Sequence, residues 1–209
     1  MTVVDIDTPH GPARAHLHPV DDPRGALVLG HGAGGGVGAR DLVRATAVAR
    51  EEGYTVALVE QPYRVAGRKS PAPPAQLDAA WRAVVAALPF DDLPLVTGGR
   101  SAGARVACRT AADTGATGVL CLAFPLHPPG RPEKSRLEEL EAVTVPVLIV
   151  QGISDPFGMP PEAPGRTVVQ VKGNHSLSSD AAGLEAAVRE WLRYVGSQDA
   201  GNAGGIRPG

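Results

Sequence analysis

The sequence predicts a single α/β domain with a mostly parallel sheet and helices on both of its faces. First, short apolar runs alternate with stretches of helical spacing along the chain, which is the order that builds such a sheet. Second, the runs are continuously apolar, as in strands that are buried on both faces. Third, a length of 209 residues suits one domain, and no internal repeat or shift in composition marks another.

The amino-terminal part predicts a hairpin followed by the first parallel strands. Residues 2–6 and 13–18 form two short strands that we expect to pair antiparallel. The compact apolar run 26–29 leads into a glycine-rich loop, and residues 54–59 form the next strand. Between them, residues 41–52 carry apolar side chains at helical spacing with arginines interspersed, which predicts a helix.

The middle of the chain predicts a loop, two helices and the strand between them. The loop covers residues 61–74 and is rich in Pro and Arg. The first helix covers residues 76–88, whose Leu, Val and Trp side chains share one side. A strand over residues 93–97 then runs into a sharp turn, and the second helix covers residues 102–112.

The last third of the chain continues the alternation and then becomes polar. Its predicted elements are strand 118–123, the Pro-rich loop 124–134, a short helix ending at residue 140, strands 145–150 and 167–171, and helix 181–195. The loop after the first of these strands is too short to hold a helical cap domain. Residues 1–196 therefore form the predicted domain, and the Gly-, Ser- and Asn-rich residues 197–209 a disordered tail.

Composition and charge argue against several classes of partner. The 20 basic and 22 acidic residues give a formal charge of −2, without a basic field for nucleic acid or an anionic membrane. No apolar run reaches the roughly 18 residues of a membrane span, and no secretory signal is recognisable. We expect a cytoplasmic protein with no nucleic-acid or membrane partner, and the Ala, Gly, Pro and Arg content is typical of high-GC bacterial coding.

The two cysteines form neither a disulfide framework nor a metal-ligand spacing. We expect no metal and no organic cofactor. Cys108 and Cys121 lie in apolar stretches and are expected to be buried as small hydrophobic side chains. The sequence indicates no oligomeric state.

A serine stands at the sharp turn between the strand over 93–97 and the helix after it, in the segment Gly99–Gly103 (GRSAG). A residue at such a turn adopts a strained backbone, and glycine neighbours let strand and helix approach closely. This strand–turn–helix context predicts that Ser101 is a nucleophile at an elbow.

A serine hydroxyl reacts well only when a base takes its proton and a carboxylate orients that base. Asp155 directly follows the strand over 145–150, and His175 follows the strand over 167–171. Taken alone, Asp155 could be explained as a residue of an ordinary turn, and His175 as a capping or loop residue. The order Ser, Asp, His at successive strand ends favours a Ser101–His175–Asp155 catalytic triad.

An acyl-transfer site also needs N–H donors that point at the developing oxyanion. The backbone of Ala102, just after the serine, is one expected donor. The other is expected from Ala33 in the glycine-rich loop 30–36. A phosphate-binding loop is the alternative for this segment, but it contains no G-x-x-x-x-G-K-[ST] sequence.

Three further residues are candidates for the substrate pocket: His31, Arg100 and His127. His31 is expected mainly to brace the glycine-rich loop. His127, in the second Pro-rich loop, is the competing base, but it precedes the acid in the chain. Six basic side chains in the loops form either a rim that binds an anionic acyl group or ordinary solvated charges. They are Arg64, Arg68, Lys69, Arg100, Arg131 and Lys134.

Five segments together resemble the α/β-hydrolase superfamily. They are Gly30–Gly35, Gly98–Gly103, Phe124–Pro132, Gln151–Gly158 and Asn174–Ser176. Within that superfamily they are similar to a cap-less branch of dienelactone-hydrolase-like proteins, which also holds testis-expressed and chromatin-complex-subunit hydrolase-like proteins. The resemblance implies an α/β-hydrolase fold without a cap domain, with Ser101, Asp155 and His175 as the triad.

Dienelactone hydrolases use a cysteine nucleophile, whereas this chain has Ser101 at that position. The resulting expectation is a serine hydrolase of carboxylesterase or thioesterase type, acting on a small-molecule acyl substrate. A non-catalytic interaction module on the same fold is the alternative, because some members of this branch are thought to be scaffolds. A lyase or acyltransferase that reuses the triad is a third option.

Overall fold

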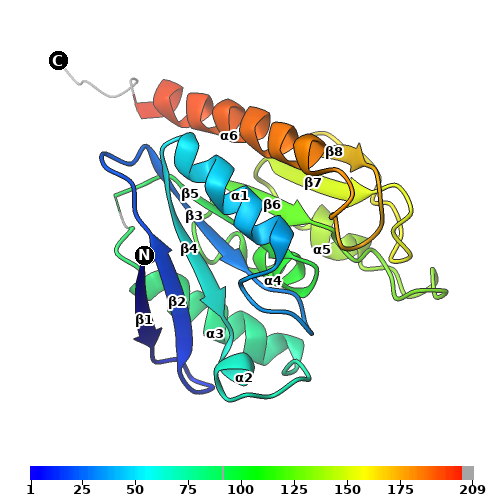
Figure 1. The fold of residues 1–209 in the computed structure, drawn as a ribbon, viewed down its shortest axis with the longest axis horizontal. Helices are drawn as coiled ribbons and strands as arrows, with labels where there is room; N and C mark the ends of the chain where they lie inside the picture. Colours follow the sequence, from blue (N-terminus) through cyan, green and yellow to red (C-terminus); the bar gives the residue numbers. More distant parts are fainter. Residues whose placement is uncertain (91, 204–209) are drawn as a thin grey trace.

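The computed structural model describes residues 1–90 and 92–203, which fold around one eight-stranded sheet (Figure 1). The strands are β1 (Thr2–Ile6), β2 (Ala13–His18), β3 (Gly25–Gly30), β4 (Tyr54–Glu60), β5 (Leu95–Arg100), β6 (Gly118–Leu122), β7 (Val147–Gly152) and β8 (Arg166–Val171). The helices are α1 (Arg40–Glu51), α2 (Pro62–Val65), α3 (Pro74–Ala87), α4 (Ala102–Thr110), α5 (Leu137–Glu141) and α6 (Ala181–Ala203).

The strand order is β1-β2-β4-β3-β5-β6-β7-β8. The predicted hairpin is confirmed, because β1 and β2 pair antiparallel, and β2 pairs antiparallel with β4. All remaining pairs are parallel, so the carboxyl ends of β3 to β8 meet at one edge of the sheet. Gly30 pairs with Gly99 in this register, which brings the glycine-rich loop after β3 next to the turn after β5.

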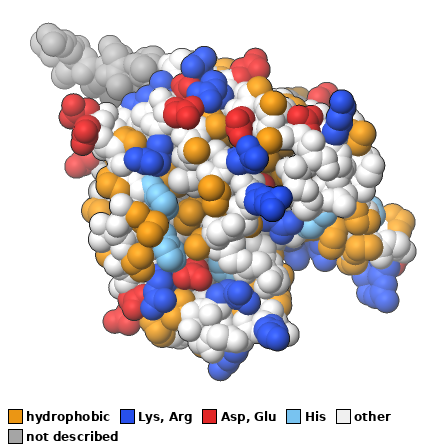
Figure 2. All heavy atoms as spheres, in the orientation of Figure 1, with side chains coloured by type: hydrophobic (Ala, Val, Ile, Leu, Met, Phe, Trp, Pro, Cys, Tyr) orange, Lys and Arg blue, Asp and Glu red, His pale blue; other side chains and the backbone are white. Residues whose placement is uncertain are grey.

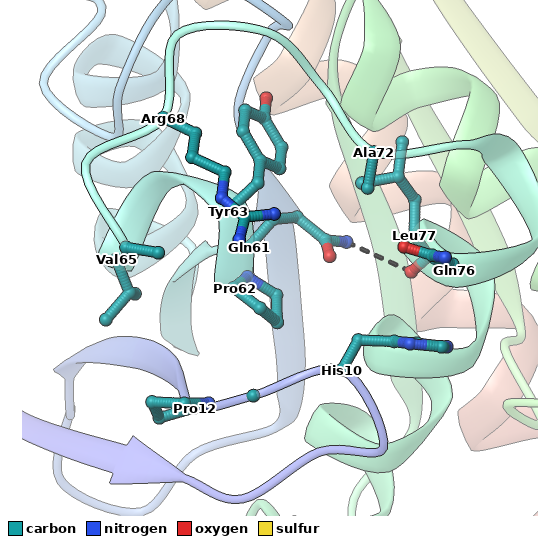
Figure 3. A pocket seen from close by; sticks show the side chains of 12 residues that line it. His10, Pro12, Gln61, Pro62, Tyr63, Val65, Arg68, Ala72, Gln76 and Leu77 are labelled. Carbon is teal, nitrogen blue, oxygen red and sulfur yellow. Dashed lines mark hydrogen bonds between the residues drawn. The ribbon is translucent and has the colours of Figure 1, made fainter.

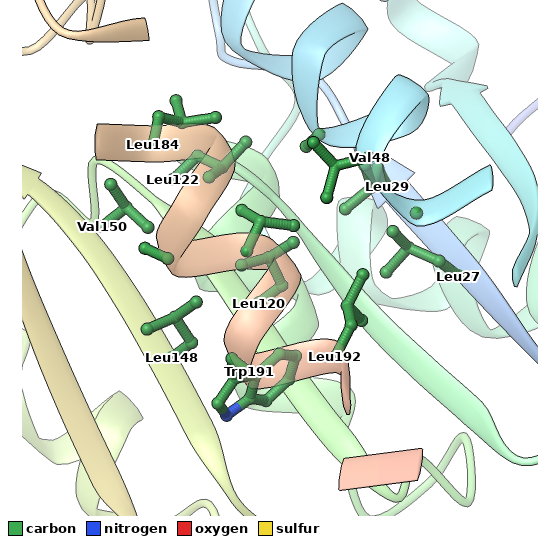
Figure 4. Packing of buried hydrophobic residues seen from close by; sticks show 14 of the residues in the cluster. Leu27, Leu29, Val48, Leu120, Leu122, Leu148, Val150, Leu184, Trp191 and Leu192 are labelled. Carbon is green, nitrogen blue, oxygen red and sulfur yellow. The ribbon is translucent and has the colours of Figure 1, made fainter. Parts of the chain in front are cut away.

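Helices cover both faces of the sheet, as the continuously apolar strands predict (Figure 1). Alternate side chains of β3 show the division: Leu27 and Leu29 belong to the core under α1 and α6, and Val28 belongs to the core under α3. Figure 4 shows the first of these cores, where Trp191 and Leu192 of α6 meet leucines of the central strands. A third core lies between α4, α5 and the neighbouring strands.

The fold has no cap domain, as the sequence predicts. Between β6 and β7, where such a domain would be inserted, the chain holds only the five-residue helix α5. The carboxyl edge of the sheet is therefore bordered by loops.

Two segments of the described chain differ from their predicted structure. The predicted loop 61–74 contains the short helix α2, which begins with Pro62 at its first turn, where proline is favoured because its missing N–H would have no acceptor. Helix α6 continues through Ala203, so residues 197–203 are helical rather than a tail, because each added residue of a formed helix gains a hydrogen bond. Residues 204–209 of the predicted tail lie outside the described residues.

Helix α6 has 23 residues. Neither α6 nor any other helix in the described ranges combines enough length with enough apolar character to cross a membrane.

Cys108 and Cys121 are buried, as predicted, and both are free thiols. Their Sγ atoms lie 3.6 Å apart across the contact between α4 and β6. The neighbouring Cys108 thiol, together with burial, raises the pKa of Cys121 well above its usual range, so this thiol stays protonated.

Candidate active site

Ser101 occupies a strained turn between β5 and α4. Its backbone angles are φ 52° and ψ −108°, a region that side-chain-bearing residues rarely adopt. Its N–H donates to the carbonyl oxygen of Leu122 at 2.9 Å, which ties the turn to β6. The neighbouring strand thus holds the serine at the carboxyl edge of the sheet, in the elbow that the sequence predicts.

Two glycines let this elbow close on the end of β3. A Cβ atom on Gly99 would lie 2.5 Å from the carbonyl oxygen of Gly30, and one on Gly103 would lie 2.4 Å from the same atom. Both distances are far inside van der Waals contact and involve backbone atoms, which have little freedom to move. The absence of side chains at these two positions is therefore a steric requirement of the elbow.

We expect the substitution Gly103→Ala to lower the free energy of unfolding by about 1–3 kcal/mol, because the added methyl group overpacks a backbone contact. Urea unfolding followed by circular dichroism measures this change. Gly38→Ala is the matched control, since a Cβ there would meet no atom within 4 Å. Equal effects of the two substitutions would contradict the steric role of Gly103.

The structure brings Ser101, His175 and Asp155 together in one hydrogen-bonded chain. The Ser101 hydroxyl lies 2.9 Å from Nε2 of His175, and Nδ1 of His175 lies 2.8 Å from Oδ2 of Asp155. The carboxylate accepts, so Nδ1 carries the proton and Nε2 is free to accept from the serine. The Asp155 side chain is 1% exposed and that of His175 is 17% exposed, so the imidazole is the more accessible of the two.

Donors other than His175 hold the Asp155 carboxylate in place. Nε2 of Gln151 donates to Oδ2 at 2.8 Å, and the N–H of Phe157 donates to Oδ1 at 2.9 Å. Nε2 of Gln151 also lies 3.1 Å from the carbonyl oxygen of Phe124 and 3.0 Å from that of Gly158. Sequence reasoning missed Gln151, although its place at the end of β7, four residues before the acid, is a usable signal.

The ring of Phe157 lies on the imidazole of His175. Their centroids are 4.2 Å apart and their planes are tilted by 31°. This contact limits rotation of the imidazole about its side-chain bonds and keeps Nε2 directed at the serine. Sequence reasoning also missed Phe157, which lies only two residues after the predicted acid.

The two predicted oxyanion donors, Ala102 and Ala33, lie in α4 and in the glycine-rich loop after β3. Ala102 is the first residue of α4, where the N–H has no acceptor within the helix. Ala33 lies in a turn closed by a 3.1 Å hydrogen bond from the Gly35 N–H to the Gly32 carbonyl. The hydroxyl of Tyr63 donates to the carbonyl of Ala33 at 2.9 Å and so supports this turn. The role of these N–H groups as oxyanion donors stays a prediction.

His31 is a buried brace of the glycine-rich loop, only 3% exposed. Its Nδ1 donates to the carbonyl of Gly32 at 2.8 Å, and its Nε2 accepts from the N–H of Gln61 at 3.1 Å. Burial lowers the pKa of His31, which favours the neutral ring that these two bonds require. These hydrogen bonds agree with the expected bracing role, and a place of His31 in a substrate pocket stays a prediction.

The Arg100 side chain contacts buried groups of the protein and is 20% exposed. Its Nε lies 2.7 Å from Oδ2 of Asp41, in an ion pair whose carboxylate side chain is 1% exposed. Its Nη2 donates to the carbonyl oxygen of His175 at 3.0 Å. A buried carboxylate needs a counter-ion, and Arg100 supplies it to Asp41, a residue that sequence reasoning missed. A role of Arg100 in a substrate pocket stays a prediction.

His127 lies against the loop that carries Asp155. Its Nδ1 lies 2.9 Å from the carbonyl of Pro128, and its backbone N–H donates to the carbonyl of Phe157 at 3.0 Å. A Cβ on Gly158 would meet the His127 ring at 2.4 Å, so the two residues are packed together. The histidine that accepts the hydrogen bond of the Ser101 hydroxyl is His175, and not this competing candidate.

A hollow of about 190 Å³ lies between the β1–β2 turn, α2 and the start of α3 (Figure 3). It is bordered by Arg68 and His10, and its floor includes Gln61, whose Nε2 donates to the carbonyl of Leu77 at 3.2 Å. The lining includes none of the triad residues. Of the basic loop residues in the predicted rim, Arg68 is the one that lines this hollow.

Charges of both signs are interspersed on the face seen in Figure 2, without a continuous basic field. Over residues 1–90 and 92–203, no group of three or more His, Cys, Asp or Glu side chains is placed to hold a metal ion.

Comparison with known proteins places the chain beside hydrolases. The sequence model of a family described as an alpha/beta hydrolase domain matches residues 23–185. A solved structure from Xanthomonas campestris, described as an a/b serine hydrolase without lid, superposes with a TM-score of 0.75 at 21% identity, over 92% of this chain and 94% of that one.

Two further solved structures share the fold. Est1E from Butyrivibrio proteoclasticus has a TM-score of 0.73 at 19% identity, over 92% of this chain and 98% of its own. A dienelactone hydrolase from Anabaena variabilis has a TM-score of 0.70 at 15% identity, over 92% of this chain and 96% of its own. At these identities the likeness establishes the architecture alone.

Proposed function

This chain belongs to the α/β-hydrolase family, as a member without a cap domain, and from that premise we propose that it is a serine hydrolase. It cleaves a carboxylic ester or thioester of a small-molecule substrate through an acyl-enzyme on Ser101. The observation that carries the proposal is the unbroken hydrogen-bonded chain from the Ser101 hydroxyl through His175 to Asp155. Such a chain is what converts a weakly nucleophilic hydroxyl into a reactive one.

In the first half of the reaction, Oγ of Ser101 attacks the acyl carbonyl carbon while Nε2 of His175 takes the hydroxyl proton. Asp155 stabilises the imidazolium that forms, without itself taking the proton. The N–H groups of Ala33 and Ala102 stabilise the negative charge on the carbonyl oxygen. The tetrahedral intermediate then collapses, and His175 gives its proton to the departing alcohol or thiol.

In the second half, a water molecule takes the place of the leaving group. His175 removes a proton from this water as the oxygen attacks the acyl carbon. A second tetrahedral intermediate collapses to release the carboxylic acid, and the proton returns to Oγ of Ser101. Atoms and charges balance with water alone, so this route calls for no cofactor.

Intact-mass spectrometry after incubation with a fluorophosphonate tests the proposal. Such a probe phosphonylates an activated serine and loses fluoride. We expect one adduct per chain, located by peptide mapping in the segment Gly99–Gly103, and no adduct on the Ser101→Ala variant. The labelling reports the activated serine directly and does not depend on guessing the substrate.

Absence of an adduct on well-folded protein would contradict the proposed activity and favour a non-catalytic interaction module. An adduct on another residue would refute the assignment of Ser101. Where Ser101 is labelled, release of free acid from a panel of esters and thioesters distinguishes hydrolysis from acyl transfer.

A further inference from the structure

The guanidinium of Arg100 touches three parts of the candidate site. It is ion-paired with Asp41 at the start of α1, and it donates to the backbone carbonyl of His175 at 3.0 Å. It also lies under the glycine-rich loop, because a Cβ on Gly32 would be 2.8 Å from its Nη1. Arg100 itself immediately precedes Ser101, so one side chain connects the serine, the base and the loop of the predicted oxyanion donor.

Asp41 is the counter-ion of this guanidinium. Its side chain is 1% exposed, and its Oδ2 lies 2.7 Å from Nε of Arg100. Its other oxygen accepts from the N–H of Leu42 at 2.9 Å, within the first turn of α1, where the helix dipole favours a negative charge. The carboxylate is thus fixed by its own helix, which directly follows the glycine-rich loop.

The contact with His175 is made to the backbone of the base itself. A charge-assisted hydrogen bond to that carbonyl restrains the backbone of a residue that lies in the short loop between β8 and α6. The restraint acts at the Cα from which the imidazole projects. It therefore acts on the distance between Nε2 and the serine hydroxyl, which is 2.9 Å here.

We propose that the Arg100–Asp41 pair positions His175 against Ser101. In this pair Asp41 (the anchor) fixes the guanidinium, and Arg100 (the arm) fixes the backbone of His175. This inference rests on the proposed function, because it assigns the pair a role in the same serine-based site. Neither residue contacts the reacting atoms in this role. Misplacing a reacting group by about 1 Å can cost about 10²-fold in rate, so the loss of the anchor has a measurable consequence.

A second arginine–aspartate pair in the chain provides the matched comparison. Arg109 of α4 forms two hydrogen bonds to Asp78 of α3, at 2.8 and 2.6 Å, and the two side chains are 18% and 14% exposed. This pair joins two helices on one face of the sheet, and Arg109 is also ion-paired with Glu139 at 3.1 Å. Asp78→Asn removes this largely buried ion pair and leaves the contact between Arg100 and His175 in place.

The experiment compares Asp41→Asn and Asp78→Asn with the wild-type chain by two readouts. The first is the second-order rate constant of fluorophosphonate labelling at Ser101. The second is the low-field proton NMR resonance of the His175 Nδ1–H in its hydrogen bond to Asp155, which reports the order of the base without requiring activity. Thermal unfolding of all three proteins shows whether each is folded.

We expect Asp41→Asn to slow labelling about tenfold to a hundredfold and to shift or broaden the His175 resonance. We expect Asp78→Asn to leave both within the range of the wild type. Unchanged labelling and an unchanged resonance in Asp41→Asn would overturn the inference, and so would equal effects of the two substitutions. If the wild type takes no probe, the proposed function fails, while the resonance still decides whether the pair orders His175.

A second variant covers the case in which Asp41→Asn does not fold. Arg100→Ala removes the arm, and because the Arg100 side chain is 20% exposed, added guanidinium ion has access to the space that it leaves. Saturable recovery of the labelling rate by guanidinium, but not by ammonium, is the expected result. Failure of guanidinium to restore any of the rate in folded Arg100→Ala would overturn the inference.

Discussion

The substitution His175→Ala is expected to lower kcat by about 10⁶-fold on any substrate that the wild-type chain hydrolyses. The imidazole is the group that accepts the Ser101 proton and later protonates the leaving group, so both halves of the reaction lose their proton carrier. Fluorophosphonate labelling of Ser101 should fall with it, because the attacking hydroxyl is no longer deprotonated as it reacts. The rate of hydrolysis at saturating substrate, measured for both proteins by a stopped assay, gives the loss in kcat.

His127→Ala is the informative companion of this variant, because His127 also follows a strand at the same edge of the sheet and is the competing candidate for the base. We expect it to change kcat by less than about tenfold, since its ring packs on Gly158 instead of contacting Ser101. A larger loss in His127→Ala than in His175→Ala would transfer the role of base to His127 and refute the assigned triad.

The substitution Asp155→Asn should lower kcat by about 10⁴-fold while the protein stays folded. An amide presents one acceptor where the carboxylate presents two, and Asp155 here accepts from His175, Gln151 and the N–H of Phe157. Turning the amide oxygen toward Phe157 places its NH₂ group against Nδ1 of His175. That arrangement stabilises the tautomer with its proton on Nε2, which cannot accept the proton of Ser101.

Asp113→Asn serves as the control for this variant, because Asp113 lies on the surface in an ion pair with Arg82 and is 55% exposed. It should retain the wild-type kcat and unfolding temperature. Retention of more than about a tenth of the wild-type kcat in Asp155→Asn would show that the carboxylate does not set the tautomer of His175.

Much of the fold follows from local patterns in the sequence. The hairpin of β1 and β2 and the parallel strands after it lie where apolar runs end in polar or glycine-rich segments. Helix α2 was missed because four residues, two of them Pro62 and Arg64, are too few to show a helical period. The end of α6 was placed too early because Gly196 signals a stop, yet this glycine packs against Arg24 and Tyr54 inside a continuing helix.

The members of the candidate triad could be proposed from the sequence because each follows a strand, and the strand ends of a parallel sheet meet at one edge. The hydrogen bonds that orient these residues could not be predicted from the sequence. Gln151 and Phe157 lie within a few residues of Asp155, but only the folded loop turns one amide onto the carboxylate and one ring onto His175. A glutamine or phenylalanine near an acid is common in sequences, so the place of Gln151 at the end of β7 could mark it as a candidate but not show its partner.

The sequence by itself determined the fold class, the absence of a cap domain between β6 and β7, and the strand ends at which Ser101, Asp155 and His175 stand. These properties depend on spacing along the chain, which a sequence displays directly. Only the tertiary structure decided that Arg100 points inward. Its direction is set by the buried charge of Asp41 and the carbonyl of His175, which are distant in the sequence, and the cost of burying an unpaired charge arises only once the chain has folded.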